Sequence, residues 1–170
     1  MRKQLPESEG TRNTRRNVAR GMHYMTWVVL LALLTLFFND FISERENPNR
    51  NLNLISHNGG EVVLQRNRSG HYVAPGLING EAVTFLLDTG ATQVSVPEVL
   101  ADRLGLEKGR RQQTMTANGV ISVHATRLDS VQLGGIELRD VSASINPYMP
   151  GDTVLLGMSF MQHLDMVQRE

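Results

Sequence analysis

Hydrophobic and polar residues alternate through much of the C-terminal part of the chain, the pattern typical of half-buried β-strands. Alternating segments are joined in pairs by Asn-Gly or Gly-Gly, which supply the positive φ angles that tight hairpin turns require. The three turns are Asn79-Gly80, Asn118-Gly119 and Gly134-Gly135. The predicted strand pairs are 71–78 with 81–87, 112–117 with 120–125, and 126–133 with 136–145. A slip in the alternation near Arg139-Asp140 indicates a β-bulge.

Two short helices are predicted in the same region. Pro97 suits a first helical turn, Leu100 and Leu104 lie four residues apart, and Gly105 is a stop signal. A second helix is predicted over 158–166. The sequence therefore predicts an all-β domain of three hairpins with one or two short helices.

The N-terminal part has a different pattern. Residues 1–21 are rich in arginine and predict a basic cytoplasmic tail. Residues 22–38 are uncharged and mostly apolar, and with Phe41 and Ile42 beyond Asn39-Asp40 the span 22–42 is long enough to cross a bilayer core of about 30 Å as a helix. The excess of basic residues before this run predicts a single-pass signal anchor with the rest of the chain exported. A cleavable signal peptide is the alternative, but Phe37 to Phe41 lacks the small residues of a cleavage site. A polar linker over 43–68 and one domain over 69–170 follow.

Composition removes several classes of function. The chain has no cysteine, which excludes disulfides and thiolate metal sites, and its five histidines are too scattered for a metal site. The formal net charge is zero, so nothing predicts nucleic-acid binding. We expect neither a metal nor a cofactor.

The candidate chemistry lies at Asp88-Thr89-Gly90, directly after the apolar run 83–87. This order places a carboxylate where a buried strand breaks into a turn, and a carboxylate so placed can hold and activate a water molecule. A Thr89 hydroxyl can lock paired loops together, and Gly90 leaves its N–H open to hold the carboxylate. The alternative is an ordinary turn with an Asx-type hydrogen bond. Gly157-Met158-Ser159 is half of a serine-nucleophile motif, but its second glycine is missing.

Taken in order along the chain, three segments carry a family resemblance. They are 85–92 around Asp88, the Asn118-Gly119 hairpin tip, and Leu155-Leu156-Gly157 with the residues up to Phe160. The sequence resembles the retropepsin-like aspartic proteases, and more closely their bacterial membrane-anchored clan AA branch. The resemblance implies a retropepsin-like half-barrel preceded by a single transmembrane helix, in the bacterial inner membrane with the C-terminal domain in the periplasm.

The resemblance also implies roles for individual residues. Asp88 would be the catalytic acid and base, supported by Thr89 and Gly90. The substrate would contact Ala91 and the tip of a flap hairpin, which comprises Ala117, Asn118 and Gly119. Leu155, Leu156 and Gly157 would form the segment beneath the acid.

The chain carries the triplet once, because Asp152-Thr153-Val154 lacks the glycine. The expected enzyme is therefore a homodimer, an aspartic endopeptidase that acts on peptide or protein substrates and contacts the lipid bilayer through residues 22–42. The alternatives are a catalytically inactive envelope interaction module with the same fold, and a peptidase that cuts only its own linker.

Overall fold

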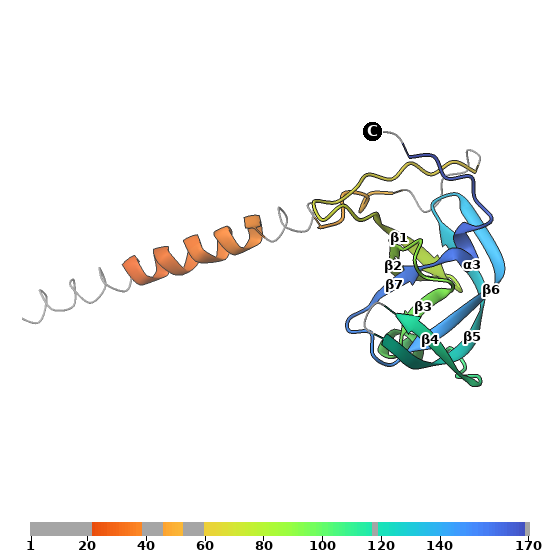
Figure 1. The fold of residues 1–170 in the computed structure, drawn as a ribbon. Helices are drawn as coiled ribbons and strands as arrows, with labels where there is room; N and C mark the ends of the chain where they lie inside the picture. Colours follow the sequence, from red (N-terminus) through yellow and green to blue (C-terminus); the bar gives the residue numbers. More distant parts are fainter. Residues whose placement is uncertain (1–21, 39–45, 53–59, 117–118, 169–170) are drawn as a thin grey trace, which may run out of the picture. The chain divides into compact units, whose positions relative to one another are not determined.

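The computed structural model describes residues 22–38, 46–52, 60–116 and 119–168 (Figure 1). The chain falls into two compact units, Met1–Ser43 and Glu44–Glu170. The predicted tail, residues 1–21, lies outside the described residues.

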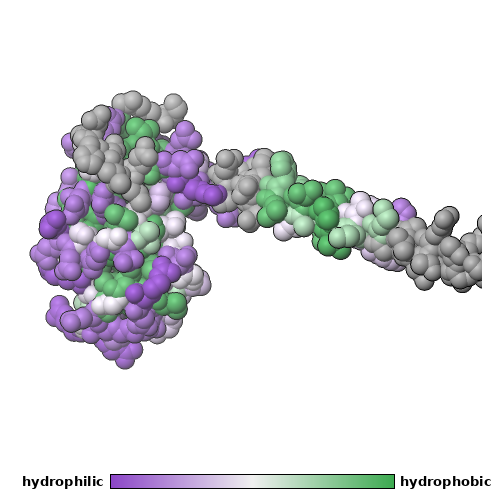
Figure 2. All heavy atoms as spheres, turned by 180° about the vertical axis from the view of Figure 1, so that it is seen from behind, coloured by the Kyte–Doolittle hydropathy of each residue, from purple (hydrophilic) through white to green (hydrophobic). Residues whose placement is uncertain are grey.

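In the first unit, one helix covers residues 22–38, and its largely hydrophobic side chains are exposed (Figure 2). The hydroxyls of Thr26 and Thr35 donate to carbonyls four residues earlier, which satisfies them within the helix. Within the described residues, no helix has the length and apolar character needed to cross a membrane. The predicted anchor over 22–42 is therefore not supported. The described helix ends at residue 38, and residues 39–42 lie outside the described part of the chain.

The described residues of the second unit form a seven-stranded sheet in the order β1-β2-β7-β3-β6-β5-β4, with two short helices (Figure 1). The strands are β1 (Val73–Ile78), β2 (Glu81–Leu87), β3 (Val94–Pro97), β4 (Arg111–Thr116), β5 (Gly119–Leu133), β6 (Ile136–Asn146) and β7 (Thr153–Leu156). Because β1 also pairs with β5, the sheet curls round and closes on itself, with Phe85 and Phe160 fully buried in its core. The predicted all-β class with few short helices is confirmed.

The predicted hairpins are present, with one difference in strand length. Asn79 and Gly80 have φ angles of 51° and 83° in the β1–β2 turn, and Gly134 has a φ of 57° in the β5–β6 turn. The sequence predicted separate strands over 120–125 and 126–133, whereas β5 runs through both. No turn residue interrupts it, so it pairs first with β4 and then with β6.

The sequence did not predict β3 or β7 as strands. Each is only four residues long, which is too short for a clear alternating pattern in the sequence, and β3 is buried along its whole length. β7 runs parallel to β2, from Thr84↔Thr153 to Leu87↔Leu156, and β3 runs parallel to β6. These two short strands join β2 to β6 in the sheet, and β7 lies directly beside β2.

Both predicted helices are shorter than expected. α2 (Glu98–Arg103) begins after Pro97, and the next helix, α3 (Met158–Met161), ends well before residue 166. Residues 162–164 continue as a turn, and Leu164 packs against the core.

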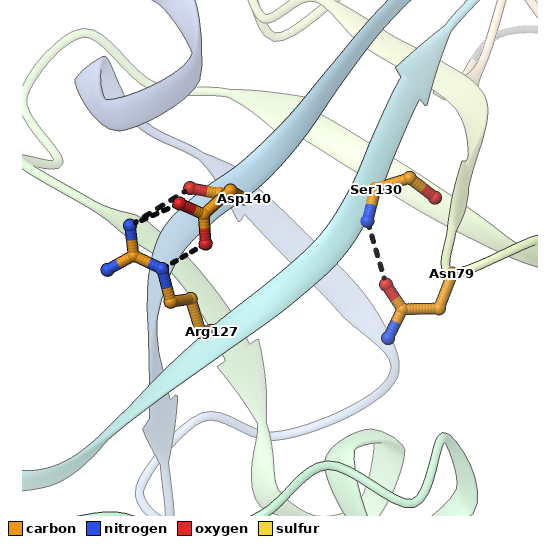
Figure 3. Close-up of polar contacts among 4 residues, drawn as sticks. All are labelled: Asn79, Arg127, Ser130 and Asp140. Atoms are coloured by element: carbon orange, nitrogen blue, oxygen red, sulfur yellow. Dashed lines mark hydrogen bonds and ion pairs between the residues drawn. The ribbon is translucent and has the colours of Figure 1, made fainter.

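The predicted bulge near Arg139-Asp140 marks a real irregularity, but no residue is inserted there. The register is unbroken, since Leu128↔Val141 and Ser130↔Arg139 belong to the same ladder. Asp140 instead has a φ of 57°, and its carboxylate accepts from two of the three guanidinium nitrogens of Arg127, Nε and Nη2 (Figure 3). Beside it, the Ser130 N–H donates to the Asn79 side chain at 3.0 Å, which joins the β1–β2 turn to β5.

Part of the predicted polar linker contacts the sheet. Asn49 is only 6% exposed. Its amide donates to the carbonyls of Gln65 and Val73 at 2.9 and 2.7 Å and accepts from the Gln65 N–H at 2.7 Å. Leu52, Val62 and Leu64 pack against the core. Asn49 and these three hydrophobic residues of the predicted linker therefore lie against the β domain; residues 43–45 and 53–59 are outside the described part.

Candidate active site

Asp88 follows the last residue of β2, beside the end of the parallel strand β7. Its N–H donates to the Leu156 carbonyl at 3.2 Å, which continues the strand pairing by one residue. The Gly90 N–H then donates to Asp88 Oδ1 at 2.9 Å, and the Ala91 N–H to the Asp88 carbonyl at 3.2 Å. The Asp88 side chain is half-buried, whereas Thr89 and Gly90 are exposed. The Gly90 bond is the one predicted from the sequence, but an ordinary Asx turn makes it too.

The rest of the loop makes contacts that an ordinary Asx turn does not require, to Gly157 and to the start of α3. Gly157 follows β7 so closely beneath the loop that a Cβ there would lie 2.6 Å from the Gln93 carbonyl carbon and 2.7 Å from the Ala91 oxygen. The first N–H groups of α3 donate to the loop, Met158 to Ala91 at 2.8 Å and Ser159 to Thr92 at 3.0 Å. The turn that carries Asp88 is therefore bound along its length to the end of β7 and the start of α3.

Ser159 completes this support, and the sequence did not assign it that role. Its Oγ accepts from the Val94 N–H at 3.0 Å and donates to the Ser142 carbonyl at 2.8 Å. The hydroxyl thus connects β3, α3 and β6 and is not available as a nucleophile. The sequence signal was its place two residues after a glycine at the start of a short helix, where a small polar side chain can satisfy backbone groups.

The structure places the other predicted site residues as follows. Ala91 is half-buried beside Asp88 and is tied to α3 through its carbonyl. Gly119 is exposed at the start of β5, with a φ of 114°. Ala117 and Asn118, the predicted flap tip, lie outside the described residues. Gln112 on β4 reaches the loop, where its Nε2 donates to Gln93 Oε1 at 3.1 Å.

Chemically, the site presents one carboxylate on a rigid loop. Among the described residues, no group of three or more histidine or acidic side chains could hold a metal ion. A lone carboxylate can accept a proton from water or, when protonated, donate one, but it cannot do both at once. Hydrolysis by this arrangement needs a second acidic group.

Comparison with known proteins agrees with this geometry. The model of the family described as "gag-polyprotein putative aspartyl protease" matches residues 74–163. That range begins in β1 and ends just after α3, so it includes Asp88 and all the elements that support it.

Two bacterial relatives and one solved structure are similar to the chain. An uncharacterized protein in the cobV 5′ region of Sinorhizobium sp is 32% identical over 111 residues, which is 64% of this chain and 48% of that protein. An uncharacterized protein of Rickettsia prowazekii (strain Madrid E) is 28% identical over 106 residues, 61% of this chain and 45% of its own. The chain thus spans about half the length of these relatives.

The solved structure is a retropepsin-like aspartic protease from Rickettsia conorii. It is 25% identical, with a TM-score of 0.51, and the match covers 65% of this chain and 84% of that one. The predicted retropepsin-like fold is confirmed.

Proposed function

Because the chain belongs to the gag-polyprotein aspartyl protease family, we propose that it is an aspartic endopeptidase whose catalytic carboxylate is Asp88. The observation that carries the proposal is the loop of Asp88 itself. A half-buried carboxylate at the end of β2 accepts a hydrogen bond from Gly90, on a turn held by α3 and by the close approach of Gly157. A reacting group needs such fixed placement, because catalysis depends on holding it in one geometry.

The second carboxylate would come from a second copy of the chain. Thr89 and Gly90 are exposed in the single chain, so the triplet is accessible to a partner. Two aspartates that meet at a twofold axis cannot both ionise cheaply, so they share one proton, as the paired aspartates of known aspartic proteases do. The pair titrates as one unit, so neither copy is permanently the acid.

The shared proton supplies both halves of the reaction. The ionised carboxylate accepts a proton from water as the water oxygen bonds to the scissile carbonyl carbon. The protonated carboxyl donates its proton to the carbonyl oxygen. Collapse of the resulting diol breaks the C–N bond: the amine nitrogen takes the proton of the protonated carboxyl, and one diol hydroxyl gives its proton to the ionised carboxylate, so that the dyad again holds one proton.

The β4–β5 hairpin suits the role of a cover for the substrate. The half-buried residues of β4 are Gln112, Thr114 and Thr116, all polar, whereas Met115 on the other face is 83% exposed. A strand that lies on a hydrophobic core shows the reverse pattern. A polar inner face can instead bind the backbone of an extended peptide. In this proposal the substrate contacts Ala91, Gly119 and the predicted tip residues Ala117 and Asn118.

The test is peptide hydrolysis by the purified 170-residue chain and its Asp88→Asn variant. Asparagine keeps the size of the side chain and an oxygen for the Gly90 N–H, but it cannot accept the proton of the water. We expect cleavage of a peptide library to fall to the background rate. Asp152→Asn, at the exposed residue directly before β7, is the matched control and should retain wild-type activity.

Two outcomes would contradict the proposal. Cleavage that survives in Asp88→Asn would place the chemistry elsewhere. A wild-type chain that cleaves nothing and stays monomeric would favour the inactive interaction module.

A further inference from the structure

The β4–β5 hairpin and the loop after Asp88 are joined by a pair of carboxamides. Gln112 Nε2 donates to Gln93 Oε1 at 3.1 Å, and both side chains are half-buried. Gln93 lies on the same loop as Asp88, and Gln112 lies on the inner face of β4, with Thr114 and Thr116. The bond therefore connects the candidate cover to the candidate catalytic loop.

The Gln93 end of this bond is fixed. Its backbone carbonyl lies against the Cα of Gly157, where no Cβ would fit. The residues on either side are bound as well, since the Thr92 carbonyl accepts from Ser159 N–H and the Val94 N–H donates to Ser159 Oγ. Only the side chain of Gln93 is left to adjust.

The Gln112 end belongs to an element that is held by fewer strand pairings. β4 is the last strand in the sheet order, and its partner is β5. The pairing of β5 with β6 begins only at His124↔Ile145, so residues 112–116 and 119–123 form a two-stranded ribbon beyond the body of the sheet. An isolated two-stranded ribbon is marginally stable, and its position depends on the few contacts it makes.

We propose that the Gln93–Gln112 hydrogen bond holds the β4–β5 hairpin against the loop that carries Asp88. Gln112 is then a positioning residue, since it acts on the reaction through the hairpin and touches neither water nor the scissile bond. The proposal rests on the proposed peptidase function, because the position of the hairpin matters to catalysis only if the hairpin contacts substrate.

The first test compares Gln112→Ala with Gln113→Ala in the full chain. Gln113 is the matched control, because it is the same residue type on the same strand but on the exposed face. A net hydrogen bond between neutral groups changes an equilibrium by roughly two- to ten-fold. We expect Gln112→Ala to raise KM by that factor with kcat within about two-fold, and Gln113→Ala to change neither.

The pair must also behave as one interaction. Gln93→Ala should raise KM by the same factor as Gln112→Ala. The KM of the double alanine variant should be no higher than that of the more impaired single variant, because the same hydrogen bond is lost in all three. Effects that multiply in the double variant would mean that the two residues act separately and would overturn the proposal.

Glutamate substitutions add a signature that loss of packing cannot give. Gln93→Glu still accepts from Gln112, and Gln112→Glu can accept from a rotated Gln93 amide, so each single variant should keep KM near wild type. The double glutamate variant has no donor once both carboxyls ionise. At pH values above about 4.3, where both carboxyls are ionised, its KM should exceed the wild-type KM measured at the same pH. At lower pH its KM should approach the wild-type value.

Hydrogen–deuterium exchange separates failure of this inference from failure of the proposed function. Amides of residues 112–123 should exchange faster in Gln112→Ala than in Gln113→Ala, whether or not the chain cleaves peptides. If wild type is inactive but this difference is present, the peptidase proposal fails and the positioning role of the bond stands. If wild type cleaves and Asp88→Asn does not, while Gln112→Ala matches Gln113→Ala in KM and in exchange, the inference is wrong.

Discussion

Gly157→Ala tests how strongly the loop that carries Asp88 depends on the element beneath it. The added Cβ would lie 2.6 Å from the Gln93 carbonyl carbon and 2.7 Å from the Ala91 oxygen, and real Cβ atoms essentially never approach within 3.0 Å. All these atoms belong to backbone, so no side chain can rotate out of the way. The loop of Asp88 or the start of α3 must move.

The size of the effect can be worked from these contacts. Bringing the Gln93 carbonyl carbon to 3.0 Å requires a shift of about 0.4 Å, and the Gln93 carbonyl oxygen, which would lie closer still to the added Cβ, requires a larger shift. A shift of that size weakens two hydrogen bonds, Met158 N–H to Ala91 and Ser159 N–H to Thr92, each worth about 1 kcal/mol net. Overpacking adds about 1–3 kcal/mol. We expect Gly157→Ala to lower the free energy of unfolding by about 2–4 kcal/mol.

Gly157→Ala should lower peptidase activity by more than the decrease in the folded fraction of the protein accounts for. A misplacement of about 1 Å can cost about 100-fold in rate, so kcat/KM should fall by roughly 10- to 100-fold under conditions where the variant is still folded. Urea denaturation gives the stability, and peptide hydrolysis of the folded variant gives the rate.

Gly60→Ala is the control, since a Cβ at Gly60 meets nothing within 4 Å. The reasoning would be refuted if Gly157→Ala matched Gly60→Ala in both the free energy of unfolding and kcat/KM.

The remaining predictions concern stability. Asn49→Ala removes the hydrogen-bond partner of Gln65 and Val73 and should lower the free energy of unfolding by about 2 kcal/mol, measured by urea denaturation. The control Asn51→Ala, at an exposed residue, should leave that free energy nearly unchanged. Equal losses in the two variants would show that the hydrogen bonds of Asn49 do not hold this segment. Hydrogen bonding to Arg127 lowers the pKa of Asp140, so this pair stabilises the fold above the ordinary carboxyl pKa of about 3.9, and the contribution is lost as pH falls through the lower folded-state value. Asp140→Asn should therefore be less stable than wild type at pH 7 and equally stable near pH 2, in a thermal-melting series at low salt. A stability difference that does not depend on pH would contradict the electrostatic origin.

Local sequence signals located the hairpins well. Asn79-Gly80 and Gly134-Gly135 predict turns because only a few residue types accept positive φ, and that preference is a property of the residues themselves. The same signals could not show that β5 continues past Ala125, because the continuation depends on a change of partner from β4 to β6. The irregularity at Asp140 was located correctly, but whether it inserts a residue depends on the facing strand.

The predicted membrane anchor is not supported within the described residues, where the helix covers 22–38; residues 39–42 of the predicted span lie outside the described part of the chain. Asn49 shows a limit of sequence composition as a signal. An asparagine in a polar stretch suggests a linker, but the carbonyl of Val73, which it binds, is 24 residues away.

The sequence by itself determined the carboxylate, its glycine and the turn that carries them, because Asp88-Thr89-Gly90 after an apolar strand is a local pattern whose chemistry depends on those residue types. Only the tertiary structure decided what holds this turn. The turn is contacted by Gly157 directly after β7, by Ser159 in α3 and by Gln112 in β4, and contacts between residues so far apart in sequence arise only when the closed sheet brings their strands together.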